Sequence, residues 1–135
     1  MTPNEAREAI YQRWAAQWGT TSPFVFDNET NTTLDAGIVA WARVSARNNG
    51  GGQETLGPTG HRGYLRRGSV FVQIFTPLNR GMKDSAVLAH QARAIFEGVS
   101  FSGIDFNNGQ VREVGPDGKW YMTVVEAAFE YYETK

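Results

Sequence analysis

Cysteine is missing from this sequence of 135 residues, and histidine occurs only twice. Without cysteine, neither a disulfide framework nor a thiolate site can form. No apolar run approaches the roughly 20 residues of a membrane-spanning helix. The polar start of the sequence lacks the basic and apolar regions of a secretory signal. We therefore expect a cytoplasmic protein with one domain over residues 1–135 and a hydrophobic core that is stable without disulfide bonds.

Strong charge of one sign is also missing, because the formal net charge is −1. This argues against a dedicated nucleic-acid-binding protein. The charges are unevenly spread, however. Residues 43–93 hold eight basic and two acidic residues, whereas residues 97–135 hold three basic and seven acidic ones. The basic and acidic regions can pair within one subunit, which is the ordinary arrangement. They can also form complementary patches between neighbouring copies.

Catalytic and metal-binding patterns are missing too. His61 and His90 do not have the spacing of a two-histidine metal site, and no third ligand accompanies them. The glycine-rich "GPTGHRG" lacks the Lys-Ser/Thr ending of a phosphate-binding loop. On a strand, Glu126 and Glu130 would lie about 13 Å apart, too far for a two-carboxylate glycosidase. We expect no enzyme, no catalytic residue, no cofactor and no metal site.

Two helices are predicted, over residues 3–18 and about 85–97. Thr2 and Glu5 form a capping box at the start of the first, and Asp84 or Ser85 suits the N-cap of the second. Residues at helical spacing, nearly all of them apolar, give each helix an inward stripe. These residues are Ala6, Ile10, Trp14 and Gln17 in the first helix, and Val87, Leu88, Ala92, Ile95 and Phe96 in the second.

The remaining periodic segments read as strands. In residues 38–47, "IVAWARVSAR", alternation puts the alanines on one face, which we assign to the core. Turn chemistry at 35–37 precedes this strand. The last third of the chain reads as a meander with hairpin turns at 107–109 and 115–118. The short connections favour an α+β fold, an antiparallel β-sheet with two helices packed on one face.

Residues 48–63, "NNGGGQETLGPTGHRG", are rich in glycine. Ordering such a segment costs much conformational entropy, and few apolar groups offset that cost. A structureless loop this long is uncommon in a compact domain. We expect either a flexible loop, mobile in an isolated subunit, or a hairpin tip that becomes ordered on a partner.

With both helices on one face, the other face of the sheet collects aromatic, methionine and charged side chains, a composition typical of interfaces. A loop folding back over this face is the competing explanation. Arg62, Arg66 and Arg67 lie close together in the sequence and suit a contact with an acidic partner. The candidate assembly interface therefore comprises Arg43, Arg47, Arg62, Arg66, Arg67, Phe71, Phe75, Trp120, Glu126 and Glu130.

An ordered series of segments resembles a known family. The series is "AREAIYQRW", "FVFDN", "VAWARVSAR", "ETLGPTGHRGYLRRGSVFVQIFTPLNRG", "SAVLAHQARAIFEG" and "WYMTVVEAAFEY". It is similar to the small tail-terminator and tail-completion proteins of long-tailed bacteriophages and gene transfer agents. The resemblance covers nearly the whole chain, and residues 107–119 fit it least well.

The resemblance implies a structural virion protein, located in the tail and in the bacterial host cytoplasm during assembly. Such a protein caps the finished tail tube as a ring, typically a hexamer, and joins the tail to the head. Its partners would be copies of itself, the tail-tube protein, the head–tail connector and DNA passing through the lumen without sequence specificity, with no membrane. A heterologous ring needs two different complementary patches on each subunit.

Two other interpretations remain open from the residues. One is a small cone-shaped α+β ligand-binding module or enzyme, similar to the nuclear-transport-factor group, with tryptophan and tyrosine lining a pocket. The other is a different head–tail connector or a tail-tube subunit. The oligomeric state separates the three interpretations, because they predict a closed ring, a monomer or dimer, and an open tube.

Overall fold

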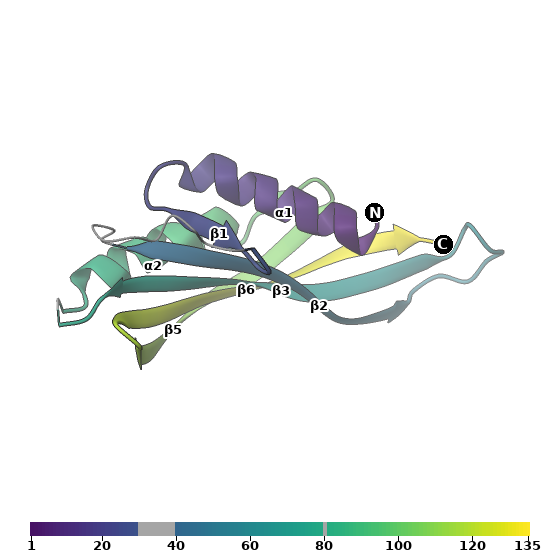
Figure 1. Cartoon of the computed structure of the whole chain (residues 1–135). Helices are drawn as coiled ribbons and strands as arrows, with labels where there is room; N and C mark the ends of the chain where they lie inside the picture. The colour runs from purple at the N-terminus through teal and green to yellow at the C-terminus, as the bar shows by residue number, and fades with distance from the viewer. Residues whose placement is uncertain (30–39, 80) are drawn as a thin grey trace.

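The computed structural model describes residues 1–29, 40–79 and 81–135 (Figure 1). The elements, in order, are α1 (Pro3–Trp18), β1 (Phe24–Phe26), β2 (Trp41–Gln53), β3 (Gly63–Pro77), α2 (Lys83–Phe96), β4 (Ser100–Phe101), β5 (Ile104–Asp117) and β6 (Trp120–Thr134). The strands form one sheet in the order β1-β2-β3-β6-β5-β4. Within the described ranges, β1 and β2 pair in parallel and the other neighbouring strands pair antiparallel. Both helices pack on one face, which confirms the predicted α+β class.

Helix α1 starts as predicted, with both hydrogen bonds of the Thr2–Glu5 capping box present. Trp14 lies at the centre of its inner face and stacks on Trp18, with ring centroids 4.5 Å apart. Gln17, predicted to point inward, is instead exposed, and Trp18 takes the buried position four residues after Trp14. Buried residues thus recur every four positions, and this row is inclined to the helix axis.

Helix α2 begins at Lys83, two residues before the predicted start. Neither predicted N-cap is correct, because Met82 holds that position and Asp84 and Ser85 lie within the first turn. The Ser85 hydroxyl donates to the Met82 carbonyl at 2.9 Å. The prediction that Val87 points inward is wrong, since Val87 is 51% exposed. The position facing the sheet is Ala89. A small residue there lets the helix lie close to the strands.

The predicted turn at 107–109 is wrong, because these residues lie inside β5 at a bulge where the register with β6 shifts. Helix α2 explains the bulge. The Gly109 amide donates to Glu97 Oε2 at 3.0 Å, and a Cβ on Gly109 would lie 2.6 Å from Arg93 Cγ. The preceding turn is at Ser102 and Gly103, whose φ values of 51° and 79° suit a tight hairpin. The predicted hairpin between β5 and β6 is present, but its turn is at Gly118 and Lys119 instead of 115–118, because β5 continues to Asp117, opposite Trp120.

The glycine-rich segment forms a hairpin tip, one of its two predicted forms. Residues 48–53 belong to β2 and pair with β3 after a bulge between Asn48 and Gly50, so only 54–62 connect the strands. Arg62 and Lys135 exchange backbone hydrogen bonds of 2.9 and 2.8 Å at the base of the tip. The hairpin extends past α1 (Figure 1). Its mobility in an isolated subunit stays a prediction.

The core lies between the helices and one face of the sheet. As predicted, Ala42, Val44 and Ala46 of β2 point into it, together with Val70, Val72 and Ile74 of β3. Six buried aromatic residues of the described chain also belong to it, namely Trp14, Trp18, Phe96, Phe106, Phe129 and Tyr131. The predicted turn at 35–37 and the first two residues of the 38–47 strand lie outside the described residues.

Candidate assembly surfaces

The face of the sheet opposite the helices, called the open face here, carries most of the predicted interface. Directly paired residues of neighbouring strands share a face. One row therefore runs from Arg43 through Gln73 and Val124 to Arg112, across four strands. Among the described elements, neither helix contacts this face. Arg112 was missed by the sequence prediction, because the wrong turn at 107–109 left the register of β5 open.

One end of the open face is closed by its own aromatic side chains. Trp41 stacks on Phe75 with ring centroids 4.2 Å apart, and Trp120 meets Trp41 edge-on at 6.5 Å. The Arg43 guanidinium lies over both stacked rings, at 5.2 Å and 5.9 Å from their centroids. Trp41 is 7% exposed and Phe75 only 3%. Phe75 is therefore buried within the subunit and offers little surface to a partner, and its place in the assembly interface stays a prediction.

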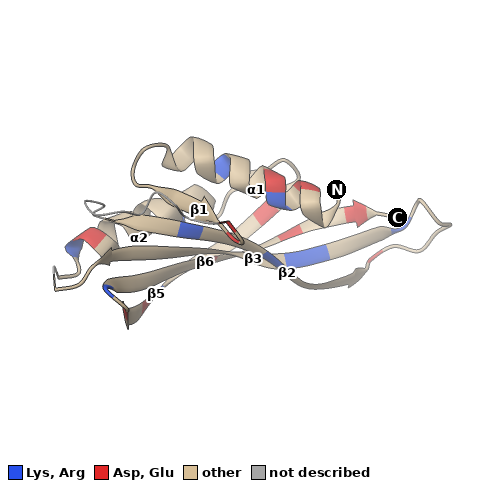
Figure 2. Cartoon of the chain, viewed as in Figure 1, with Lys and Arg blue, Asp and Glu red and all other residues tan. Residues whose placement is uncertain are grey.

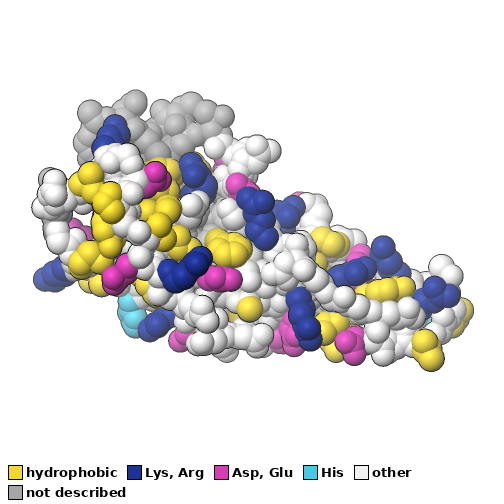
Figure 3. Space-filling model, turned by 90° about the horizontal axis from the view of Figure 1, so that it is seen from below, with side chains coloured by type: hydrophobic (Ala, Val, Ile, Leu, Met, Phe, Trp, Pro, Cys, Tyr) yellow, Lys and Arg dark blue, Asp and Glu magenta, His cyan; other side chains and the backbone are white. Residues whose placement is uncertain are grey.

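The middle of the open face is hollowed and accessible. A cavity of about 280 Å³ lies there, lined by Ser45, Arg47, Phe71, Gln73, Arg112 and Val124. Arg47 pairs with Asp27 at 2.5 Å, and Arg112 lies 3.9 Å from Glu126. Figure 3, seen from the side opposite α1, shows hydrophobic side chains gathered at one end and charges of both signs along the rest.

The arginines near the hairpin do not form one cluster. Arg66 lies on the helix side of the sheet and donates to Glu133 Oε1 at 2.9 Å. Arg67 lies on the open face, 3.6 Å from Glu130. Arg62 sits at the base of the tip and donates to the Gly57 carbonyl at 2.7 Å. Figure 2 shows the basic part of β3 beside acidic parts of β6. Much of the uneven charge is therefore paired within the subunit.

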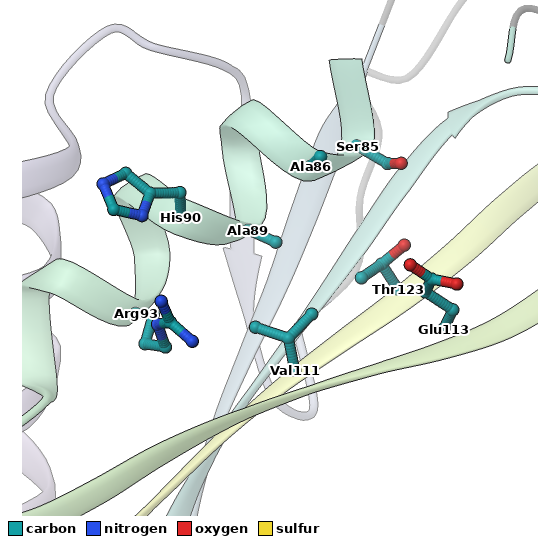
Figure 4. Close-up of a pocket in the computed structure, with 8 residues that line it drawn as sticks. All are labelled: Ser85, Ala86, Ala89, His90, Arg93, Val111, Glu113 and Thr123. Atoms are coloured by element: carbon teal, nitrogen blue, oxygen red, sulfur yellow. The ribbon is translucent and has the colours of Figure 1, made fainter. Parts of the chain in front are cut away.

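A second hollow, which the sequence did not predict, lies between α2 and β5 (Figure 4). Its volume is about 140 Å³. Thr123 also lines the hollow, and its hydroxyl is buried within the subunit without a hydrogen-bond partner among the described residues. Ala86 and Ala89 leave the space open on the helix side. The full lining is Ser85, Ala86, Ala89, His90, Arg93, Val111, Glu113 and Thr123.

The described residues hold no group of three or more histidine, aspartate or glutamate side chains that could bind a metal ion. His61 is exposed in the hairpin tip and His90 is exposed on α2. The resolved pKa shifts belong to two tyrosines. Burial raises the pKa of Tyr11 and of Tyr131 above the ordinary value, and Glu133 raises that of Tyr131 further. Over the described ranges, no helix is long and apolar enough to cross a membrane.

Comparison with known proteins supports the fold without giving a function. No protein-family model matches the chain, and no curated protein matches it either. A solved structure of a protein that carries no functional name superimposes with a TM-score of 0.61 at 18% identity. The match covers 100% of this chain and 96% of the other chain. The whole chain therefore corresponds to a fold that exists as one unit of similar length.

Proposed function

We propose that this chain is a structural subunit that assembles with copies of itself into a ring, caps a phage-type tail tube and joins the tail to the head. The supporting observation is the open face, which combines half-buried Phe71, Gln73 and Met122 with charges of both signs. Aromatic residues, methionine and arginine are enriched at protein interfaces. The rest of the proposal follows from the sequence resemblance.

A protein partner suits this face better than nucleic acid does. Arg112 and Arg67 lie within 4 Å of Glu126 and Glu130, so acidic groups offset the positive charge of the face. A phosphate backbone requires a basic surface without such acids nearby. A complementary pattern of charges on another protein would fix its orientation and register. DNA in the lumen would then pass without strong contact.

The cone-shaped ligand-binding module fits the structure less well. Such a module needs a pocket between its helices and the sheet. Here that space is filled, because Trp14 stacks at 6.3 Å on Phe96, which lies 5.1 Å from Phe106. The hollow beside α2 is about 140 Å³, well below the roughly 300 Å³ at which ligand pockets begin.

The test combines oligomeric state with tail assembly. Size-exclusion chromatography with light scattering should show a closed ring of about six subunits, as the resemblance implies, and electron microscopy should show a central hole. Phe71→Asp should leave the melting temperature nearly unchanged and abolish the joining of tails to heads in complementation of particles that lack this chain. Ala15→Asp adds the same charge on the exposed side of α1 and serves as the control. A wild-type protein that stays monomeric at all concentrations, or a fully active Phe71→Asp variant, would refute the proposal.

A further inference from the structure

We propose that the hairpin tip of one copy docks into the hollow between α2 and β5 of a second copy, with Leu56 as the inserted side chain. This inference deepens the proposed function, since it names the contact that would link neighbouring subunits. It rests on the proposed function only because it requires this chain to assemble with copies of itself. Each subunit then uses two different surfaces, the tip and the hollow.

Leu56 is the most exposed large hydrophobic residue of the described chain, with 92% of its surface accessible. It lies at the end of a hairpin whose base is fixed by the backbone bonds between Arg62 and Lys135. Within the tip, the Thr55 hydroxyl accepts from the Gly63 amide at 2.6 Å. The tip therefore presents an apolar side chain on a loop held by hydrogen bonds. Inserting the Leu56 side chain into a partner would remove its apolar surface from water.

The hollow has the size and the chemistry to receive this side chain. Its volume of about 140 Å³ is close to the ~150 Å³ apolar cavity that accepts benzene in an engineered protein, so a leucine side chain fits. Val111, 38% exposed, provides an apolar wall. Ala86 and Ala89 contribute only methyl groups on the helix side, which leaves room there for the leucine side chain.

Charge also matches between the two surfaces. The hollow carries one base and one acid at its rim, Arg93 and Glu113. The tip also carries one acid and one base, Glu54 and Arg62, which flank it on either side and can each face the group of opposite charge. Opposite charges at a rim set orientation more than affinity. The apolar insertion would supply the affinity, and the two charge pairs would select one of the two possible directions of entry.

The tip and the hollow cannot meet within one subunit. The hairpin extends from one end of the sheet, and the start of α2 lies at the other end (Figure 1). A contact between two different surfaces of identical subunits is heterologous, and it closes into a ring when the rotation between neighbours allows. The tip of each subunit would then occupy the hollow of the next one.

The free sheet edges are a weaker alternative for the same contact. Among the described residues, nothing pairs with the outer edge of β2 beyond the short strand β1, or with most of the outer edge of β5. Each edge carries a bulge, at Asn48–Gly50 and at Glu113–Gly115, and β5 also contains Pro116. Bulges and proline protect edges against pairing with another chain. Edge-to-edge assembly is therefore disfavoured.

The first experiment measures the oligomeric state of single variants by light scattering over a range of protein concentrations. Leu56→Asp removes the inserted group, and Ala86→Arg fills the hollow from an exposed helix position. We expect each to weaken association by roughly 10- to 100-fold, the factor that corresponds to losing one buried leucine, with an unchanged thermal melt of the subunit. Thr59→Asp on the same loop and Ala94→Arg on the same helix are matched controls and should assemble normally.

The second experiment uses the absence of cysteine from the natural chain. Leu56→Cys combined with Ala86→Cys should give a ladder of disulfide-linked subunits on non-reducing electrophoresis after mild oxidation. Disulfides form only where Cβ atoms come within about 4.5 Å, so a Thr59→Cys/Ala94→Cys control should stay unlinked. If both single variants still form the same ring as the wild type and the cysteine pair gives no ladder, the docking contact is overturned while the proposed function stands. Filaments or dimers that depend on Leu56 support the contact and overturn the ring. A monomeric wild type overturns both.

Discussion

Reversing the charge of Arg66 should destabilise the subunit, whereas the same change at the adjacent Arg67 should have little effect. The Arg66 side chain is 26% exposed, and its partner Glu133 is 10% exposed, with Nε and Oε1 2.9 Å apart. Breaking a buried pair by removing one partner costs about 3–5 kcal/mol. Because Arg66 retains some contact with water, solvent screening weakens the pair, and we expect Arg66→Glu to lower the free energy of unfolding by about 2–3 kcal/mol.

The Arg67–Glu130 pair provides the matched comparison. Its side chains are 61% and 37% exposed and lie 3.6 Å apart, so Arg67→Glu should cost only about 0–1 kcal/mol. Urea unfolding at neutral pH, at one fixed protein concentration, measures both values. For a domain of this size the difference corresponds to roughly 5–10 °C in melting temperature.

A charge swap completes the test. The double variant Arg66→Glu/Glu133→Arg restores opposite charges at the same two positions and should recover at least half of the lost stability. Equal free energies of unfolding for Arg66→Glu and Arg67→Glu would refute the reasoning. So would a swap variant that is no more stable than Arg66→Glu alone, because the loss would then come from packing rather than from charge.

Three further predictions concern the fold. Ile95→Asp should prevent folding because it places an unpaired charge in the core. Leu88→Asp changes a half-buried position and should give a soluble protein with a lower melting temperature. Thermal melting followed by circular dichroism distinguishes the two variants. Gly68→Ala should destabilise by about 1–3 kcal/mol or more in urea, because the new Cβ would lie 2.2 Å from a backbone carbonyl oxygen. Tyr131 has a raised pKa, so its contribution to stability is complete below the unfolded value of about 10 and is lost as the pH rises through the folded value. Tyr131→Phe removes the 2.8 Å hydrogen bond to Asn48 and should therefore lower the free energy of unfolding by about 1 kcal/mol at neutral pH. Above pH 10, the stability of this variant should fall less steeply than that of the wild type. Equal slopes of stability against pH in the two proteins would contradict this prediction.

Local periodicity was enough to predict the helices and the inner face of the sheet. The Thr2–Glu5 capping box and the alternation of β2 each depend on residues that are neighbours in the sequence. Asn107–Gly109 shows where that approach ends. The tripeptide has the chemistry of a hairpin turn, yet Glu97 and Arg93 of α2 contact Gly109 and accommodate it as a bulge.

The candidate surfaces were predicted less well than the fold, for two different reasons. Arg66 and Arg67 were grouped because they are adjacent, although adjacent residues of a strand point to opposite faces. Strand periodicity alone could have separated them. The hollow beside α2 was not predictable in this way, because it needs the placement of the helix over β5 and the orphaned hydroxyl of Thr123. Both arise from contacts between distant parts of the chain.

The position of β6 has a consequence for how the protein folds during synthesis. It is the last strand along the chain, yet it lies between β3 and β5 and pairs with both over most of its length. A ribosome therefore releases β3 and β5 before the strand that joins them exists. Until β6 emerges, nascent chains expose two unpaired strand edges, which favours aggregation. Pairing between distant segments such as Gly63 and Thr134 also slows folding, so the centre of the sheet is completed last.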